Sequence, residues 1–408
     1  MDEPRFDFEH LRVGRMPRRY RLAVLVSHPI QYQAPLYRRL AERSDLDIEV
    51  FFFTEHGVRP TYDPGFGISF QYDVPLTDGY RHRFLRNLSR KPSVDFLGAI
   101  NPEVASIVRD RAFDAVLVHG YAHASSVLAA LTPRGRFPRL IMRSESNLLH
   151  PRSLRTRLAK RLVLPPLFDR FDHFLAIGAD SRDYFVSFGV EPSRITIAPY
   201  SVDDRFFRDQ SVDARRDPDA ARARIGLPRG VPLFLFCAKL IPVKRPLDAI
   251  RALEIARRTT PCELVIVGDG ALRDAVEREI ASRRLDAYVH LLGFKNQSEL
   301  PAIYGACDGF VLPSDIEPWG LVVNEAMACG LPIATTDRVG AARDLVEGVG
   351  EVYPVGDVDR LGAILARWAA DPALRKHQSD ASIERIGRWS IEATADAYAA
   401  GVRECVER

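Results

Sequence analysis

The feature that most constrains the fold is a repeated alternation of short apolar runs with longer amphipathic stretches. Residues 21–26 form an apolar run, and the stretch after it carries Leu36 and Leu40 at helical spacing before a second apolar run at 48–53. Short apolar runs that alternate with helices are typical of parallel sheets with crossover helices. We therefore predict an α/β fold, in which ligands bind beyond the carboxyl ends of the strands.

Length and composition narrow the class of protein. With 408 residues, of which 46% are hydrophobic, the chain is long enough for two domains. A formal net charge of +3 is too small to indicate a nucleic-acid partner. The five cysteines form no Cys-x-x-Cys pair, which is typical of buried thiols in a reducing compartment. No apolar run approaches the roughly 20 residues that span a bilayer. We expect a cytoplasmic protein.

Polar residues follow two of the predicted strands. His28, Gln31 and Tyr32 come directly after the first strand, and His119 and His123 follow the apolar run that begins at residue 114. These five side chains are therefore predicted to line the crevice at the carboxyl edge of the sheet. The alternatives are a proline-shaped turn with a packed tyrosine at the first site and hydrogen-bonded surface histidines at the second.

The stretch 313–332 reads as a strand end, a tight loop and a helix. Glu317 lies in the loop and Glu325 lies eight positions later, inside the helix. Gly320 permits a turn, so the helix from Leu321 presents a free N-terminus that suits a phosphate. The two carboxylates would instead bind hydroxyl groups. A nucleotide sugar carries both phosphate and hydroxyl groups. The alternative is a solvated loop acid and an unrelated acid on the helix surface.

Two lysines follow the apolar run that starts at Leu233. Lys239 and Lys244 lie five positions apart, with Arg245 next to the second, although arginine fills most basic positions of this chain. Compact ammonium groups suit a departing diphosphate, whose charge grows as the bond to the sugar breaks. A solvated loop is the alternative.

A glycine turn at Gly268 and Gly270 follows the next strand. A dinucleotide fingerprint would need a third glycine at position 273, where the chain has Arg273. The sequence therefore argues against a nicotinamide oxidoreductase.

Taken together, these segments resemble the retaining glycosyltransferases of family 4. The stretch 313–332 is similar to that family's E-x7-E signature, with Pro318-Trp319 in place of the usual Gly-Phe. The lysine loop resembles the family's G-R-L-x-x-x-K-G segment, with Lys239 at the arginine position. The usual Gly-Gly loop after the first strand is absent, and the His-Pro-Ile-Gln-Tyr loop at 28–32 resembles a bacterial subgroup instead.

The resemblance implies the GT-B arrangement, in which two Rossmann-like domains with parallel sheets face each other across a cleft. It predicts an acceptor domain over 20–202, a nucleotide-sugar domain over 203–388 and a C-terminal helix, 389–408, that crosses back to the first domain. Residues 1–19 are expected to form a frayed leader, because they carry charges of both signs and no apolar signal core.

The resemblance also assigns roles to residues. The predicted catalytic residues are Glu317, His119, Lys244 and Lys239. The predicted donor-binding residues are Lys239, Lys244, Arg245, Gly268, Gly270, Phe294, Glu317, Trp319, Gly320, Leu321 and Glu325. The predicted acceptor-binding residues are His28, Gln31, Tyr32 and His123. No cofactor and no metal is expected, because the two lysines would neutralise the diphosphate.

Two further segments concern the acceptor. The insertion 54–87 is dense in aromatic and acidic residues, which would suit a sugar acceptor or simply form core. The stretch 150–161 is rich in arginine, with Leu154 and Leu158 at helical spacing. We expect it to form either a solvated helix or a peripheral contact with an anionic membrane at the inner face, where a lipid-linked acceptor would lie.

The sequence thus predicts a retaining glycosyltransferase that moves a sugar from a nucleoside-diphosphate sugar to a hydroxyl of a glycan, a lipid-linked or a small-molecule acceptor. The alternative is a non-catalytic GT-B module that binds a nucleotide or a glycan. The nucleotide base, the donor sugar and the acceptor all stay open at this point.

Overall fold

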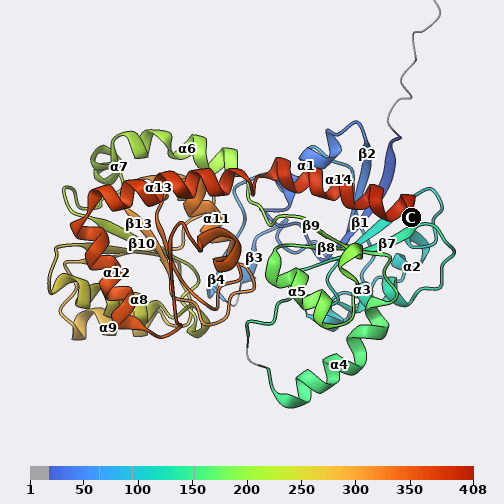
Figure 1. Ribbon diagram of the computed structural model, residues 1–408, viewed down its shortest axis with the longest axis horizontal. Helices are drawn as coiled ribbons and strands as arrows, with labels where there is room; N and C mark the ends of the chain where they lie inside the picture. Colours follow the sequence, from blue (N-terminus) through green and yellow to red (C-terminus); the bar gives the residue numbers. More distant parts are fainter. Residues whose placement is uncertain (1–17, 64, 94, 151) are drawn as a thin grey trace, which may run out of the picture.

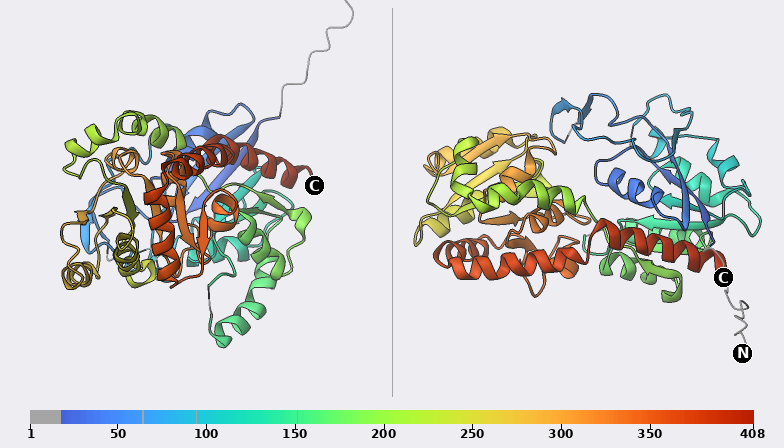
Figure 2. Two further views of the ribbon diagram at one scale, coloured as in Figure 1. Left: turned by 60° about the vertical axis from the view of Figure 1, so that its left-hand side comes forward. Right: turned by 90° about the horizontal axis from the view of Figure 1, so that it is seen from above.

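The computed structural model describes residues 18–408 except 64, 94 and 151. Two parallel sheets lie side by side with helices around each (Figures 1 and 2). Most of the predicted leader, residues 1–17, lies outside the described residues. The predicted α/β fold with two parallel sheets is confirmed.

The first sheet has seven strands in the order β5-β2-β1-β6-β7-β8-β9, all parallel. Their bounds are β1 (Tyr20–Val26), β2 (Leu46–Phe52), β5 (His82–Phe84), β6 (Ala115–His119), β7 (Arg139–Ser144), β8 (His173–Ala176) and β9 (Ile195–Ile197). Alternate residues of β1 pack into different cores: Leu22 and Val24 on one face, Ala23 and Leu25 on the other. Burial of both faces explains why residues 22–26 of the strand are all apolar.

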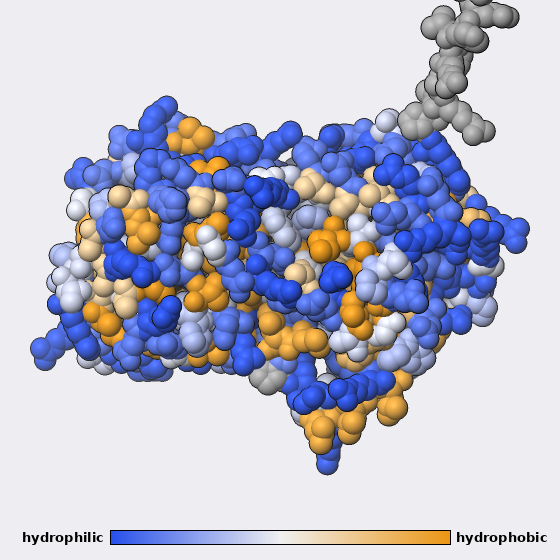
Figure 3. Space-filling view, viewed as in Figure 1, coloured by the Kyte–Doolittle hydropathy of each residue, from blue (hydrophilic) through white to orange (hydrophobic). Residues whose placement is uncertain are grey.

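The helices of the first domain are α1 (Ala34–Ala41), α2 (Val104–Ile107), α3 (Ala124–Leu131), α4 (Leu154–Phe168) and α5 (Ala179–Ser187), with 3₁₀ turns at Phe96–Gly98 and Pro192–Arg194. Helix α4 projects from the body of the molecule at the lower edge of Figure 1. Residues 152–159 at its start are all exposed. Figure 3 shows hydrophobic and hydrophilic side chains together on this projection.

The second sheet has six parallel strands in the order β12-β11-β10-β13-β14-β15. Their bounds are β10 (Leu233–Cys237), β11 (Glu263–Val267), β12 (Val289–Gly293), β13 (Gly309–Leu312), β14 (Ile333–Thr336) and β15 (Glu351–Tyr353). Its helices are α6 (Asp204–Arg216), α7 (Pro218–Arg224), α8 (Pro246–Arg257), α9 (Arg273–Ser282), α10 (Leu300–Gly305), α11 (Leu321–Ala328), α12 (Val358–Ala370) and α13 (Pro372–Gly387), with a 3₁₀ turn at Pro242–Lys244 and a π-helical turn at Ala342–Val346. The charged stretch 204–232, where the chain enters the second domain, contains two helices, α6 and α7.

The last helix, α14 (Ile391–Glu407), belongs structurally to the first domain. It lies against α1 and the strands β1, β6, β7, β8 and β9. Its buried residues share one core with β1 and α1. The chain therefore crosses between the domains twice, after β9 and again between α13 and α14, where the red helix runs across the view in Figure 1.

The insertion after β2 contains an antiparallel hairpin, β3 (Thr61–Asp63) and β4 (Ile68–Phe70), followed by β5. The hairpin reaches across to the second domain. Asn296 Nδ2 donates to the Gln71 carbonyl at 2.7 Å, and the Ser298 hydroxyl donates to Asp73. The hairpin therefore helps to enclose the space between the domains.

Candidate active site between the domains

Two cavities between the domains are lined by seven of the sixteen predicted site residues. The larger, about 410 Å³, is lined by His119, Arg143 and Tyr32 of the first domain and by Pro318 of the second, and we call it the His119 cavity. The smaller, about 140 Å³, is lined by Gln31, Phe66 and Phe70 of the first domain and by Phe294 and Glu325 of the second, and we call it the Glu325 cavity. Both lie at carboxyl ends of strands, as predicted from the parallel sheets.

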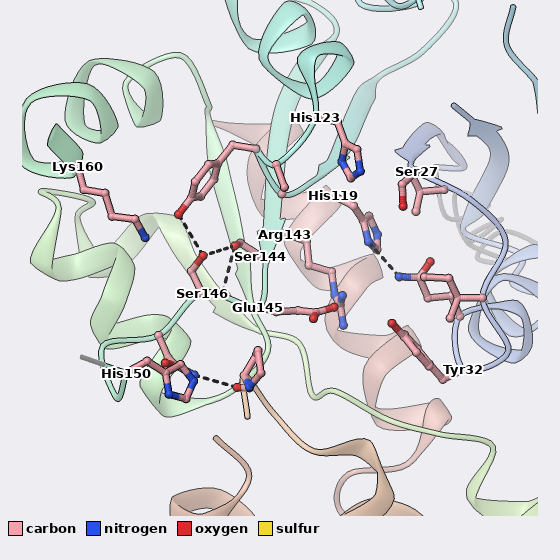
Figure 4. Close-up of a pocket in the computed structure, with 18 of the residues that line it drawn as sticks. Ser27, Tyr32, His119, His123, Arg143, Ser144, Glu145, Ser146, His150 and Lys160 are labelled. Atoms are coloured by element: carbon pink, nitrogen blue, oxygen red, sulfur yellow. Dashed lines mark hydrogen bonds between the residues drawn. The ribbon is translucent and has the colours of Figure 1, made fainter. Parts of the chain in front are cut away.

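His119 stands at the end of β6 with its orientation fixed by a relay (Figure 4). The Tyr37 hydroxyl donates to Gln33 Oε1 at 3.1 Å, which leaves Gln33 Nε2 to donate to His119 Nδ1 at 3.3 Å. The ring proton of a neutral His119 must then lie on Nε2. Burial, and next the charge of Arg143, hold the pKa of His119 well below its ordinary value, so the ring stays neutral. His119 Nε2 is buried and has no hydrogen-bond partner among the described residues, so it can serve a ligand hydroxyl.

The floor of the His119 cavity carries a buried charge. Arg143, at the end of β7, is 3% exposed, and its guanidinium lies 4.5 Å from the centre of the Tyr200 ring. The Tyr200 hydroxyl donates to Glu145, and Tyr32 meets the Tyr200 ring edge-on at 5.5 Å. Figure 4 shows Arg143, Glu145 and Tyr32 close to His119, with His150 and Lys160 on the opposite side of the cavity.

Lys244 and Glu317 form an ion pair in the cleft. Lys244 ends the 3₁₀ turn after β10, and Glu317 lies in the loop between β13 and α11. Glu317 directly precedes Pro318, which lines the His119 cavity. Both side chains are largely buried, at 18% and 13% exposure. A polar ligand here would find one cation and one carboxylate adjacent to each other.

Lys239 is paired across the two domains. Its Nζ donates to both carboxylate oxygens of Asp63, at 2.9 and 2.8 Å, and lies 4.7 Å from the centre of the Phe66 ring. Burial alone would raise the pKa of Asp63, but the hydrogen bond and charge of Lys239 hold it below its ordinary value. The hairpin of the first domain thus places the Asp63 carboxylate on Lys239, one of the two lysines predicted to bind the diphosphate.

The Glu325 cavity combines an acid with aromatic walls. Glu325, on α11, accepts a hydrogen bond from the Tyr304 hydroxyl at 2.9 Å, and burial raises its pKa to about 7. Phe294 meets Phe66 and Phe70 at centroid distances of 5.0 and 4.7 Å. Gly268 lies on the same wall with φ +136, and a Cβ there would come within 2.0 Å of the Ala238 carbonyl oxygen, so only glycine fits.

Helix α11, which carries Glu325 and follows the Glu317 loop, begins at a glycine turn. Gly320 has φ +95, which glycine adopts without penalty, and α11 starts at Leu321 with no side-chain cap at its N-terminus. The helix end therefore has free N–H groups and the positive end of its dipole. It follows Glu317 by three residues, so an anion held by Lys244 would lie close to it.

Three predicted residues have other contacts. Trp319 is buried at 3% exposure, stacks on Trp389 at 5.2 Å and donates to Asn324, so it packs between domains and lines neither cavity. Arg245 donates to Asp248 at 2.6 Å at the start of α8. His28 bonds Ser27 and meets His56, and it too lines neither cavity.

The remaining predicted residues divide between the cavities. Tyr32 and His123 line the His119 cavity, whereas Gln31, predicted as an acceptor ligand, lines the Glu325 cavity with the predicted donor residues. Gly270 lies beside the hairpin, where a Cβ would come within 2.7 Å of the Gly65 carbonyl oxygen.

Four residues of the site were missed as ligands by sequence reasoning. Arg143 and Glu145 follow an apolar strand, the same signal that pointed to His119, and that signal was available. Asp63 was noted only as one acid of the insertion, and His150 only as the start of a basic stretch. The partner of Asp63, Lys239, lies 176 positions away in the sequence, so no local pattern reveals that pair.

Within the described part of the chain, no group of three or more His, Cys, Asp or Glu side chains is arranged to hold a metal ion. Nor does any helix of that part combine the length and the apolar composition needed to cross a membrane.

Family models match both halves of the chain. Residues 29–201 match a "Glycosyl transferase 4-like domain", and residues 217–385 match "Glycosyl transferases group 1". The boundary between the two matches falls after β9, where the chain leaves the first sheet.

Curated relatives are similar over part of the chain. A glycogen synthase of Mycobacterium tuberculosis is 34% identical over 192 residues, which cover 46% of this chain and 45% of the relative. A D-inositol 3-phosphate glycosyltransferase of Thermomonospora curvata is 29% identical over 231 residues, or 53% of each chain. The chain thus aligns with about half the length of the curated relatives it matches.

Solved structures share the whole fold. A glycosyltransferase from Rickettsia africae superposes with a TM-score of 0.72 at 14% identity, covering 96% of this chain and 99% of the other. The Anabaena protein Alr3699/HepE, solved with UDP and glucose, gives 0.68 at 19% identity, covering 93% and 98%. The predicted two-domain GT-B fold is confirmed.

Proposed function

We propose that the chain moves a sugar from a nucleoside diphosphate to an acceptor hydroxyl, because its first half matches a "Glycosyl transferase 4-like domain" and its second half matches "Glycosyl transferases group 1". The observation that carries the proposal is the pair of lysines in the cleft, each already bound to a carboxylate. A diphosphate offers the same oxygen ligands and more charge, so it would replace Asp63 on Lys239 and Glu317 on Lys244.

The donor would lie with its nucleoside in the Glu325 cavity. The aromatic wall of Phe294, Phe66 and Phe70 would contact the base, and Glu325 would bind ribose hydroxyls. Lys239, Lys244 and the start of α11 would hold the diphosphate. The structure of a relative with UDP-glucose supports a nucleotide-sugar donor of this class.

The transferred sugar would lie towards the His119 cavity. Glu317, freed from Lys244, would accept hydrogen bonds from sugar hydroxyls, and His119 would donate from Nε2. The relay from Tyr37 and Gln33 holds His119 before the ligand arrives, which lowers the cost of orienting it during the reaction. The acceptor would enter by the same cavity.

We propose that transfer proceeds with retention at the anomeric carbon, as in the family that the sequence resembles. The acceptor oxygen would bond to the anomeric carbon as the bond to the diphosphate breaks, and its proton would pass to the leaving phosphate oxygen. The lysines and the α11 N-terminus would stabilise the departing charge without a metal. No protein nucleophile is assigned.

We also propose that α4 rests on an anionic membrane surface. Its exposed side chains include Leu154, Leu158 and Leu162, at 68%, 52% and 77% exposure. No acidic residue lies between Glu145 and Asp169, while five basic ones do. Exposed leucines beside uncompensated cations are typical of helices that bind at a lipid interface.

A thermal-shift panel tests the proposed function. UDP, GDP, ADP and their common sugar conjugates would be added to the wild type, Lys244→Ala and Lys376→Ala, which removes an exposed lysine from α13. A nucleotide at about 100 times its Kd adds roughly 2.7 kcal/mol of stability. We expect one nucleotide to shift the wild type and Lys376→Ala but not Lys244→Ala.

The same panel separates the alternatives. If no nucleotide at millimolar concentration shifts any of the proteins, the donor site does not exist and the proposal is wrong. If a nucleotide sugar binds to the wild type and to Glu317→Ala equally well and neither protein consumes it, the chain is a non-catalytic binding module.

A further inference from the structure

A third cavity, about 580 Å³, opens beside the His119 cavity and is basic on several sides. We call it the basic cavity. It lies between the loop at 147–150, helices α4 and α5, and Arg338 of the second domain. Its charged lining residues are Arg152, Arg157, Lys160, Arg161 and Arg338, and no aspartate or glutamate is among the lining residues described.

The charges of the basic cavity are not balanced by acids. None of these five side chains forms an ion pair within the described part of the chain. Lys160 Nζ donates to the Tyr184 hydroxyl at 3.0 Å, and Arg338 donates to the Leu149 carbonyl. Both partners are neutral, so they leave the positive charge in place. Like charges gathered in a concave site repel one another and concentrate anions there.

His150 gives an independent sign of a missing ligand. It is 8% exposed, and both of its ring nitrogens are buried without a hydrogen-bond partner among the described residues. Buried polar groups without partners are rare in native proteins, because the lost bonds to water are not replaced. His150 lines both the basic cavity and the His119 cavity, so a ligand that spans the two would satisfy it.

The basic cavity and the His119 cavity adjoin each other and share part of their lining. Asn147, His150, Arg152 and Lys160 line both of them. Figure 4 shows His150 and Lys160 on one side of the His119 cavity and His119 with Ser27 on the other. A molecule with a hydroxyl group near His119 could therefore extend an anionic group to the arginines.

We propose that the basic cavity binds the phosphate or diphosphate group of the acceptor. Arginine matches phosphate oxygens with paired N–H groups, and four of the five bases that line the cavity are arginines. The identification of the bound molecule as the acceptor rests on the proposed function. The proposal that the cavity binds a phosphate group is independent of that function.

The test uses inorganic pyrophosphate on the full chain, titrated calorimetrically with saturating UDP present to occupy the donor lysines. The variant is Arg157→Ala with Arg161→Ala, two exposed positions at which alanine favours the helix. The matched control is Arg155→Ala, which removes an equally exposed arginine of α4 that does not line the cavity. We expect the double variant to weaken pyrophosphate binding by about tenfold or more and the control by less than about twofold.

Two outcomes would overturn the proposal: no pyrophosphate binding to the UDP-saturated wild type, or an equal loss in Arg155→Ala and the double variant. A Lys244→Ala protein keeps the test independent of the proposed function. If UDP fails to bind the wild type, the donor site is wrong. Pyrophosphate binding that survives Lys244→Ala but not the double variant still establishes the basic cavity.

A competition arm identifies the source of the phosphate. Vesicles of phosphatidylcholine with phosphatidylglycerol would displace pyrophosphate if the cavity takes the phosphate of a lipid. If pyrophosphate stays bound in the presence of the vesicles, the cavity takes a soluble phosphate compound. Either result supports a phosphate site.

Discussion

At the scale of single residues, the site depends on groups whose protonation is set by burial. Glu325 is the clearest case. It lines an apolar cavity and has the Tyr304 hydroxyl as its hydrogen-bond donor, yet burial raises its pKa to about 7. An empty site therefore holds a carboxyl group that is partly protonated at neutral pH, whereas ribose hydroxyls would favour the ionised form.

Glu325→Gln should change how stability depends on pH. The carboxyl group has a pKa of about 7 in the folded protein and an ordinary value of 4.5. The folded state therefore binds the proton more tightly, and this stabilisation is complete below pH 4.5 and lost as the pH rises to 7. Glutamine has no proton to lose. Relative to the wild type, the variant should gain up to about 3 kcal/mol over this range.

Urea unfolding at several pH values measures this difference. Tyr304→Phe is the control, because removing the hydroxyl that stabilises the carboxylate should move the loss of stability to higher pH. Parallel stability curves for the wild type and Glu325→Gln would show that burial does not raise the pKa.

The sequence predicted the residues that local patterns reveal. His119, Lys244 and Glu317 lie at or after strand ends and Glu325 lies inside the helix that follows, and the structure brings all four to the cleft or its cavities. It did not predict that Asp63 pairs with Lys239, because that contact joins residues 176 positions apart. Trp319 shows the opposite error, since a residue within a binding motif packs between domains.

At the scale of elements, α4 is the least ordinary part of the fold. Its first two turns contact little of the protein, and an isolated helix of that length is unstable in water. The parallel sheets and their crossover helices were predictable from apolar runs. The projection of α4 was not, because its leucine spacing would suit a buried face equally well.

Replacing Leu158 and Leu162 of α4 by asparagine should weaken vesicle binding. Both leucines are exposed, so the fold does not need them, but a lipid surface would cover them. Transfer of each leucine is worth about 1.5 kcal/mol or more, so the pair should reduce binding by well over tenfold. Co-sedimentation with phosphatidylglycerol-containing vesicles measures it.

Leu131→Asn is the control for this experiment, because Leu131 is 57% exposed at the end of α3, away from the basic stretch. It should bind vesicles as the wild type does. If the α4 variant binds vesicles as well as the wild type does, the proposed membrane contact is wrong. If salt does not weaken vesicle binding of the wild type, the basic side chains do not contribute to that contact.

At the scale of the whole molecule, the two domains are joined by polar contacts across the cleft and by aromatic packing at its base. Lys239 and Asp63 pair across it, and Asn147 donates to the Pro318 carbonyl at 2.9 Å. At the base, Trp319 lies between Tyr200 and Trp389. The chain also crosses between the domains twice. Because of these crossings and the aromatic packing, we expect the cleft to close in one defined way rather than the domains to move freely.

Asp63→Asn should strengthen UDP binding. The donor diphosphate must displace the Asp63 carboxylate from Lys239, and asparagine competes less because it carries no charge. The pair is partly exposed, so we expect a decrease in the Kd for UDP of about fivefold, or about 1 kcal/mol. Isothermal titration calorimetry measures it.

Asp73→Asn is the matched control. Asp73 also contacts the second domain, but its partner is the neutral Ser298 rather than a lysine. It should leave the Kd for UDP unchanged. If Asp63→Asn weakens UDP binding instead, the hairpin supports the donor rather than competing with it.

The position of α14 bears on how the protein is made. Helix α14, residues 391–407, covers a face of the first sheet that includes Leu22 and Val24, so it completes that core. The strands of the same core leave the ribosome up to hundreds of residues earlier. During synthesis that face stays open while the whole second domain emerges. The first domain therefore cannot finish folding in the order of its translation, and a nascent chain would expose an apolar surface that chaperones recognise.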